Sequence, residues 1–225
     1  MTQPPTPPEP PLSPADSLAL IDAQQASRTR GKHLASALLC GIWGFAYLVS
    51  WGAFYLARER VLPDLVAEIL TTVLIVGVIV FSAVFGVRSS QGVRGPSQVV
   101  GAMYGFSWTL GFLALVAINV GLQQKGLTPD QVTLLWSGSV LLLVGVLYLA
   151  GGAVFHSWPH YAVGAWTMIT GAASVYVGVP GNFLVLSLAG GGGFLVQAGY
   201  YTWRGLRPAD PGCAGPGPIG LNAAL

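Results

Sequence analysis

The residues best able to bind a ligand are aromatic side chains that recur at a fixed spacing in two apolar stretches. A spacing of four residues stacks side chains along one face of an α-helix. The aromatic residues with this spacing are Trp43, Tyr47, Trp51 and Tyr55 in the first stretch and, in a weaker copy, Tyr104, Trp108 and Phe112. Such a ridge can hold a flat or cationic ligand by stacking or cation–π contact. It can equally pack against another helix or anchor the chain at a membrane interface.

Glu68 is the exception among apolar stretches whose interiors otherwise carry almost no charge. Placing a charge in hydrocarbon is costly, so an ionisable residue within a membrane span indicates function. One interpretation is a carboxylate that couples to a cation or a proton and faces the aromatic ridge. The other is an interfacial carboxylate near a helix N-terminus that pairs with Arg58 or Arg60.

Four consecutive glycines, Gly190 to Gly193, occupy the middle of the last apolar stretch. Each costs roughly 1 kcal/mol of helix propensity relative to alanine, so the run needs a physical reason. Either two helices approach closely there, or the helix breaks and exposes backbone groups to a substrate path. Gln197, one turn further on, fits both interpretations. The pair Gly101 and Gly105 has the spacing of close helix packing or a dimer contact.

Patterns typical of catalytic and metal sites are weak in this sequence. His156 and His160 have a spacing that suits a shared metal on an intact helix, but Pro159 lies between them. Cys40 and Cys213 fit no metal-binding spacing. No phosphate-binding loop or basic nucleic-acid patch is present. We therefore expect no enzyme activity, no catalytic or metal-binding residue, no cofactor and no nucleic-acid partner.

The elements that position these residues are membrane-spanning helices. The chain is 53% hydrophobic and only 8% charged, whereas soluble domains carry about 25% charged residues. Six apolar runs are long enough to cross a hydrocarbon core of roughly 30 Å. They cover residues 34–57, 65–86, 98–121, 132–155, 160–179 and 182–203. The predicted fold class is all-α, a polytopic membrane protein with a bundle of six transmembrane helices. Thr128-Pro129-Asp130-Gln131 predicts a capping box at the start of the fourth.

The two ends of the chain differ in composition from the membrane domain at 34–203. Residues 1–33 open with a proline-rich tail that we expect to be disordered. A short amphipathic helix then begins at Ser13-Pro14 and ends at Gly31, and we expect it to lie on the cytoplasmic membrane surface. Residues 204–225 are rich in proline and glycine and are also expected to be disordered.

Positive charges predict the orientation, because they collect on cytoplasmic loops. With six spans, one side of the membrane carries Arg28, Arg30, Lys32, Arg88, Arg94, Arg204 and Arg207, and the other carries Arg58, Arg60 and Lys125. Seven charges against three place both termini in the cytoplasm of a multi-pass plasma-membrane protein.

The segment Leu12 to Gln24, followed by basic residues and by Gly41-Ile42-Trp43-Gly44, resembles one group of known sequences. These are uncharacterised small multi-span integral membrane proteins of high-GC Gram-positive bacteria, some of them loosely labelled transporters. The resemblance implies a membrane location and favours transport. It implies no site residues.

Two functions agree with these observations. The first is a small transporter or permease-like component. The second is a non-transporting scaffold or sensor that engages a cytoplasmic partner through its N-terminal segment. Expected partners are the lipid bilayer and either a second copy of the chain or a separate cytoplasmic subunit. A substrate path would use Trp43, Tyr47, Trp51, Glu68, Tyr104, Trp108 and Gln197. Helix packing would use Gly44, Gly101, Gly105, Gly190, Gly191, Gly192 and Gly193.

Overall fold

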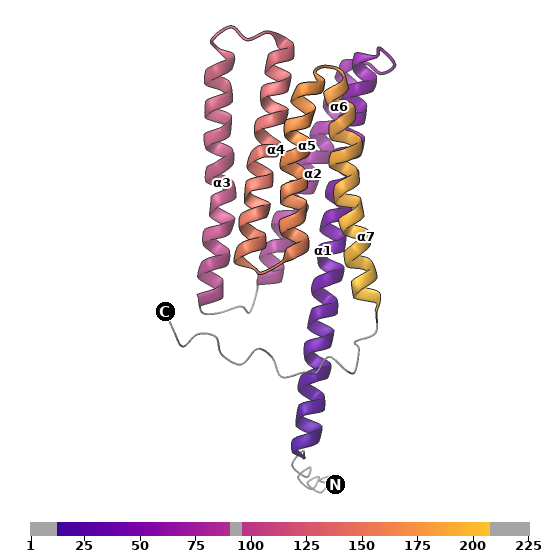
Figure 1. Cartoon of the computed structure of the whole chain (residues 1–225), viewed down its shortest axis with the longest axis vertical. Helices are drawn as coiled ribbons and strands as arrows, with labels where there is room; N and C mark the ends of the chain where they lie inside the picture. Colours follow the sequence, from indigo (N-terminus) through magenta and orange to yellow (C-terminus); the bar gives the residue numbers. More distant parts are fainter. Residues whose placement is uncertain (1–12, 91–95, 208–225) are drawn as a thin grey trace, which may run out of the picture.

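The computed structural model describes residues 13–90 and 96–207, and all regular elements in these ranges are helical. In chain order they are α1 (Pro14–Arg58), α2 (Asp64–Ser90), α3 (Pro96–Gln123), α4 (Pro129–Val154), α5 (Trp158–Val177), α6 (Gly181–Val185), the π-helix η1 (Leu186–Gly191) and α7 (Gly192–Leu206). Since α6, η1 and α7 follow one another without a break, they form a single rod. The result is a bundle of six rods (Figure 1), which confirms the predicted all-α polytopic fold class.

Five of the six rods are long and apolar enough to cross a membrane: α1, α2, α3, α4 and the α6–η1–α7 rod. The remaining one, α5, has 20 residues, which corresponds to roughly 30 Å of helix. The N-terminus of α1 and the C-terminus of α7 lie toward the same end of the bundle (Figure 1). We call that end proximal and the opposite end distal.

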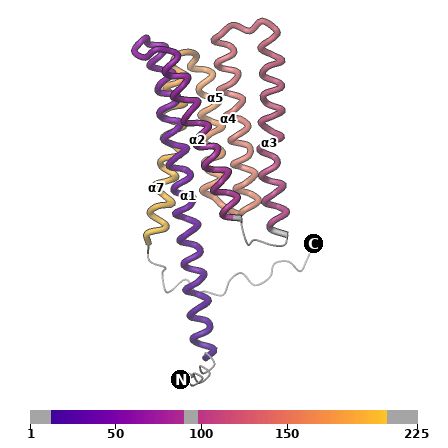
Figure 2. The backbone as a smooth tube through the Cα atoms, turned by 180° about the vertical axis from the view of Figure 1, so that it is seen from behind, coloured from indigo at the N-terminus to yellow at the C-terminus, as the bar shows by residue number. Residues whose placement is uncertain are grey.

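Helix α1 is longer than the sequence predicted. Its N-cap is Ser13, whose hydroxyl oxygen accepts a hydrogen bond from the backbone N–H of Asp16 at 3.2 Å. The helix then runs 45 residues to Arg58, straight through Gly31, where we expected a separate helix to end. A glycine that ends a helix commonly adopts a left-handed backbone, and Gly31 does not. The predicted surface helix is therefore a continuous extension of the first span, and it projects beyond the bundle (Figure 2).

The capping box predicted for α4 is confirmed. The backbone N–H of Thr128 donates to Gln131 Oε1 at 2.9 Å, and the backbone N–H of Gln131 donates to Thr128 Oγ1 at 3.3 Å. Thr128 thereby sets the start of α4 at Pro129. The turn at residues 178–182 reverses the chain between α5 and α6, and its Val179–Pro180 peptide bond is cis.

Helices α4 and α5 pack closely through glycines spaced seven residues apart. On α4 they are Gly138, Gly145 and Gly152, and on α5 they are Gly164 and Gly171. A methyl group added at Gly164 would lie 2.6 Å from the Leu149 backbone nitrogen and 2.8 Å from the Gly145 carbonyl oxygen. A seven-residue repeat keeps one face of each helix against its neighbour. The two backbones therefore touch almost directly along most of their length.

Candidate binding pocket at the distal end

A pocket of about 480 Å³ opens between α1, α2, α4 and α6. Its lining residues come from the distal parts of these four helices. They are Trp51, Phe54, Arg58, Asp64, Glu68, Val132, Thr133, Trp136, Ser137 and Phe183. Two of the residues that we assigned to a substrate path, Trp51 and Glu68, are therefore brought together in one pocket.

Three aromatic rings form one wall of this pocket. Phe183 on α6 stacks on Trp51 with ring centroids 5.9 Å apart, and on Phe54 at 5.7 Å. Trp51 and Phe54 also touch each other at 6.1 Å. Phe183 is only 4% exposed, because both rings of α1 cover it. The wall is thus a continuous aromatic surface that joins α1 and α6.

Two carboxylates face these rings from α2. Asp64 and Glu68 are four residues apart, so they lie on one face of the helix, and both line the pocket. Both side chains are exposed, and neither forms an ion pair or side-chain hydrogen bond with another residue that the structure describes. The pairing of Glu68 with Arg58 or Arg60, one of our two interpretations, is not seen among these residues. With Arg58 as the pocket's cation, the lining residues carry one net negative charge.

A tightly packed apolar cluster lies on the proximal side of the pocket. Leu141 and Leu186 are fully buried, and Tyr47 packs against both. Trp51, from the aromatic wall, packs on the same cluster. We call Tyr47, Leu141 and Leu186 the central plug, because they form one buried cluster between α1, α4 and η1.

Three buried polar atoms near the wall have no hydrogen-bond partner in the described part of the chain: Ser50 Oγ, Asn182 Nδ2 and Asn182 Oδ1. Their residues are 2% and 0% exposed, respectively. Ser50 precedes Trp51 in the chain and Asn182 precedes Phe183, and the rings of Trp51 and Phe183 stack on each other. An unsatisfied buried polar group costs about 1–3 kcal/mol. This cost is thus concentrated where α1 meets α6.

The glycine run lies partly in the π-helix and is not a break in the rod. A methyl group at Gly191 would lie 2.9 Å from the Gly44 carbonyl oxygen, and one at Gly193 would lie 2.5 Å from the Trp166 ring. One at Gly190 would make ordinary contact with Tyr47, and one at Gly192 would meet no atom within 4 Å. Close approach to α1 and α5 therefore accounts for Gly191 and Gly193.

Side-chain hydrogen bonds hold the π-helix in place. The Trp166 indole N–H on α5 donates to the Ala189 carbonyl oxygen at 2.9 Å. The Ser187 hydroxyl donates to the Leu48 carbonyl oxygen on α1 at 2.8 Å. π-Helical segments are rare and often occur at functional sites. Here the segment begins at Leu186, which is part of the central plug.

The other predicted path residues lie away from the pocket. Trp43 Nε1 donates to Ser82 Oγ on α2 at 3.1 Å, and Tyr104 Oη donates to the Leu147 carbonyl oxygen at 2.8 Å. Trp108 contacts the Tyr104 ring at 6.3 Å. Each of the two hydrogen bonds ties neighbouring helices together.

Gln197 joins three helices near the proximal end. Its Nε2 donates to the Pro159 carbonyl oxygen at 3.0 Å, and its Oε1 accepts from Cys40 Sγ at 3.4 Å. Both ends of the amide are therefore occupied, and the side chain is only 5% exposed. In this conformation Gln197 cross-links α1, α5 and α7.

The two aromatic ridges are connected through the middle of the bundle. Phe194 on α7 lies 5.7 Å from Tyr47 and 5.6 Å from Tyr148 on α4, measured between ring centroids. Tyr148 in turn lies 5.8 Å from Trp108. The network therefore runs from α1 through α7 and α4 to α3.

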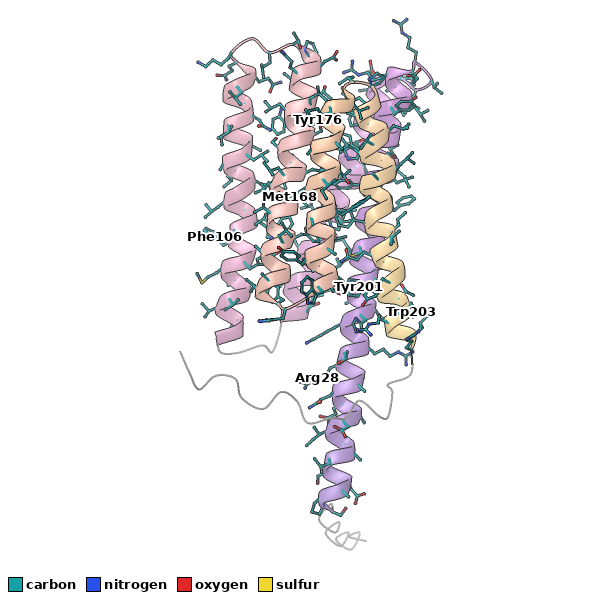
Figure 3. The ribbon with its side chains drawn as sticks, in the orientation of Figure 1. Arg28, Phe106, Met168, Tyr176, Tyr201 and Trp203 are labelled. Carbon is teal, nitrogen blue, oxygen red and sulfur yellow. The ribbon has the colours of Figure 1, made fainter. Side chains whose placement is uncertain are left out.

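Gly101 and Gly105 on α3 face open space, since an added methyl group at either would meet no atom within 4 Å. Phe106 beside them points away from the bundle (Figure 3), and it is 62% exposed. Within this chain α3 packs mainly against α4. Its outer face is left to lipid or to another chain.

Several residues that line the pocket were not assigned to it from the sequence, among them Phe54, Asp64, Trp136 and Phe183. Asn182, the buried residue before Phe183, was not singled out either. Asp64 carried a usable signal, because it lies one turn before Glu68 and shares its helix face. Phe183 and Trp136 carried none, since neither belongs to an aromatic repeat and both are far from Trp51 in the chain.

No family model matches this chain, and no solved structure matches it. It is similar to the NADH-quinone oxidoreductase subunit N of Saccharopolyspora erythraea, with 34% identity over 108 residues. The match covers 46% of this chain and 19% of that protein. The chain therefore spans about a fifth of the relative's length.

Proposed function

We propose that this membrane protein is a small transport component, an exporter or a permease-like subunit, with the distal pocket as its substrate site. The observation that carries the proposal is the placement of two carboxylates, Asp64 and Glu68, opposite an aromatic wall, with no ion-pair partner among the residues that the structure describes. Ionisable residues in membrane-spanning helices commonly mark substrate or ion pathways, and Glu68 lies one turn inside α2. Glu68 is our candidate for the carboxylate that binds the substrate or a coupling cation.

Transport requires the central plug to open, and the π-helix is the element best suited to allow this. A π-helical segment is wound more widely than the surrounding α-helix, with i→i+5 hydrogen bonds, so a local shift to α-helix rotates the residues beside it. Leu186 begins the segment and belongs to the plug. We infer that a change in η1 withdraws Leu186 from Tyr47 and Leu141 and connects the pocket to the proximal side.

The proposed orientation places the proximal end in the cytoplasm and opens the distal pocket toward the outer side of the plasma membrane. The positive charges support this orientation: among the residues that the structure describes, six lie toward the proximal end and three toward the distal end. We further propose that the chain itself catalyses no reaction and uses no cofactor.

Proteoliposomes can test transport even though the substrate is not identified. Vesicles with and without the protein are incubated in a cell extract, washed, and their contents are read by mass spectrometry. We expect at least one compound to accumulate only with the protein, and to accumulate less with Glu68→Gln. Glu59→Gln is the matched control, because Glu59 is exposed and lies outside the pocket. Identical contents in protein-containing and protein-free vesicles would contradict the proposal.

A second candidate is a membrane scaffold or complex subunit, and one observation favours it. The side chains of α1 from Pro14 to Lys32 are exposed or half-buried, and this stretch projects beyond the bundle (Figure 2). Leu18 is 62% exposed and Leu20 is 50% exposed there. The similar protein is, by its name, a subunit of an oxidoreductase. This function predicts that Leu18→Ser with Leu20→Ser reduces the native mass of the solubilised complex, as read by mass photometry.

A further inference from the structure

We propose that the distal pocket binds a flat, monovalent organic cation between its aromatic wall and the carboxylates of α2. This inference rests on the proposed function, because it names the substrate class of the same pocket.

The aromatic wall selects for a flat, positively charged ligand. The face of an aromatic ring attracts cations, and the attraction strengthens when the site is shielded from water. Trp51 and Phe54 are half-buried and line the pocket, so their rings are open to a ligand. Phe183 is 4% exposed and supports both rings from behind by stacking on them. Trp136, on α4, adds a fourth ring to the lining.

The charges of the pocket select for a single positive charge. Asp64 and Glu68 contribute two negative charges and Arg58 contributes one positive charge, which leaves a net charge of −1. Neither carboxylate has a side-chain partner among the residues that the structure describes. A bound cation can therefore form an ion pair with one of these carboxylates, whereas a neutral ligand cannot.

The remaining lining residues argue against a bare metal ion. Hard cations such as Ca²⁺ take six to eight oxygen ligands. Apart from the two carboxylates, the only lining side chains that carry oxygen are Thr133 and Ser137, and the Ser137 hydroxyl already donates to the Leu134 carbonyl oxygen at 3.2 Å. The rest of the lining is aromatic, aliphatic or cationic. A volume of about 480 Å³ instead falls in the range of small-molecule pockets, roughly 300–1,000 Å³.

The test compares two ligands of nearly the same shape that differ in charge, N-methylacridinium and acridine, at pH 8. Binding to the full-length protein in nanodiscs is measured by ligand fluorescence. We expect N-methylacridinium to bind roughly tenfold more tightly than acridine, as a cation–π contact together with a carboxylate partner implies. Equal affinities for the two ligands would overturn the proposal.

Matched variants assign the affinity to the pocket. We expect Glu68→Gln to weaken N-methylacridinium binding about tenfold and Phe54→Leu to weaken it several-fold. The controls, Glu59→Gln and Phe45→Leu, lie outside the pocket and should leave the affinity within about twofold. Helix content by circular dichroism verifies that each variant is folded. An unchanged affinity in folded Glu68→Gln protein would contradict our assignment.

The binding and transport results can fail separately. Tight, Glu68-dependent binding of N-methylacridinium without accumulation of any compound in proteoliposomes would support the ligand class and contradict transport. Accumulation of neutral or anionic compounds without N-methylacridinium binding would support transport and contradict the ligand class.

Discussion

Phe183 shows how a single residue can serve both the packing of the bundle and the construction of the pocket. Its ring is 4% exposed and stacks on Trp51 and Phe54 of α1. The residue before it, Asn182, is fully buried, and neither amide atom has a hydrogen-bond partner among the residues in ranges 13–90 and 96–207. Well-packed apolar contacts and a costly polar group therefore stand side by side at the start of α6. Such a local conflict is expected where function competes with stability.

The unpaired Asn182 amide leads to a stability prediction. Asn182→Leu keeps the branched shape of the side chain and removes two buried polar atoms, so we expect stabilisation by about 1–3 kcal/mol. The measurement is the melting temperature in detergent, followed by intrinsic fluorescence. Leu186→Ala is the contrasting variant and should lower the melting temperature, because it leaves a cavity at a fully buried site. A lower melting temperature for Asn182→Leu would contradict this prediction.

Among the elements, the α4–α5 pair depends on glycines whose neighbours are backbone atoms. Backbone cannot move aside as a flexible side chain can, so a methyl group there must separate the helices. We expect Gly164→Ala, which would place carbon 2.6 Å from the Leu149 nitrogen, to destabilise the bundle by more than about 1 kcal/mol.

Gly192→Ala is the matched comparison for Gly164→Ala, because it is helical and has no atom within 4 Å of the added methyl group. The gain in helix propensity should stabilise it by up to about 1 kcal/mol. Melting temperatures of the two variants should therefore move in opposite directions. A shift of the same sign in both would mean that packing does not decide the effect at Gly164.

The π-helix provides a second prediction at the level of elements. Deleting Gly192 removes one residue beside η1, which should convert the segment to α-helix and leave its flanks in register. We expect the helix content to be retained. Accumulation in proteoliposomes should fall by about tenfold or more, because Leu186 could no longer move between its place in the plug and the withdrawn position. Retained accumulation in a folded deletion variant would exclude η1 from the transport mechanism.

At the scale of the whole molecule, one strongly exposed aromatic residue lies near each end of α5, at the heights expected of the two membrane interfaces. Tyr176 near the distal end is 93% exposed, and Trp158 near the proximal end is 81% exposed. They lie 18 residues apart on α5 (176 − 158), which corresponds to roughly 27 Å of helix. Aromatic side chains favour membrane interfaces, and this separation is close to the thickness of a hydrocarbon core of about 30 Å. The exposed extension of α1, including Arg28 (Figure 3), lies beyond the proximal level.

Single cysteines test the orientation of the whole bundle. In a background with Cys40 and Cys213 replaced by serine, we expect Lys125→Cys to react with a membrane-impermeant maleimide in intact cells. Arg28→Cys should react only after permeabilisation, because α1 begins on the cytoplasmic side in the proposed orientation. Labelling of Arg28→Cys in intact cells would invert the topology and place the pocket in the cytoplasm.

The sequence alone determined the class of fold and the approximate positions of the six rods. In lipid the backbone has no water to bond, so every apolar run must satisfy its own hydrogen bonds as a helix. Local signals such as Thr128 and Gln131 also set helix starts correctly. The helix end predicted at Gly31 was wrong. Gly31 keeps a helical backbone, and α1 continues through it to Arg58.

Only the tertiary structure decided which residues share the pocket. Helical periodicity predicts which side chains lie on one face of a helix, but it does not say which other helix that face meets. Trp51 and Phe183 are 132 residues apart in sequence (183 − 51) and stack at 5.9 Å, while Gln197 became a cross-link between helices. These contacts depend on how close the backbones come, and that distance is set by glycines such as Gly44 and Gly191, which act in pairs across helices.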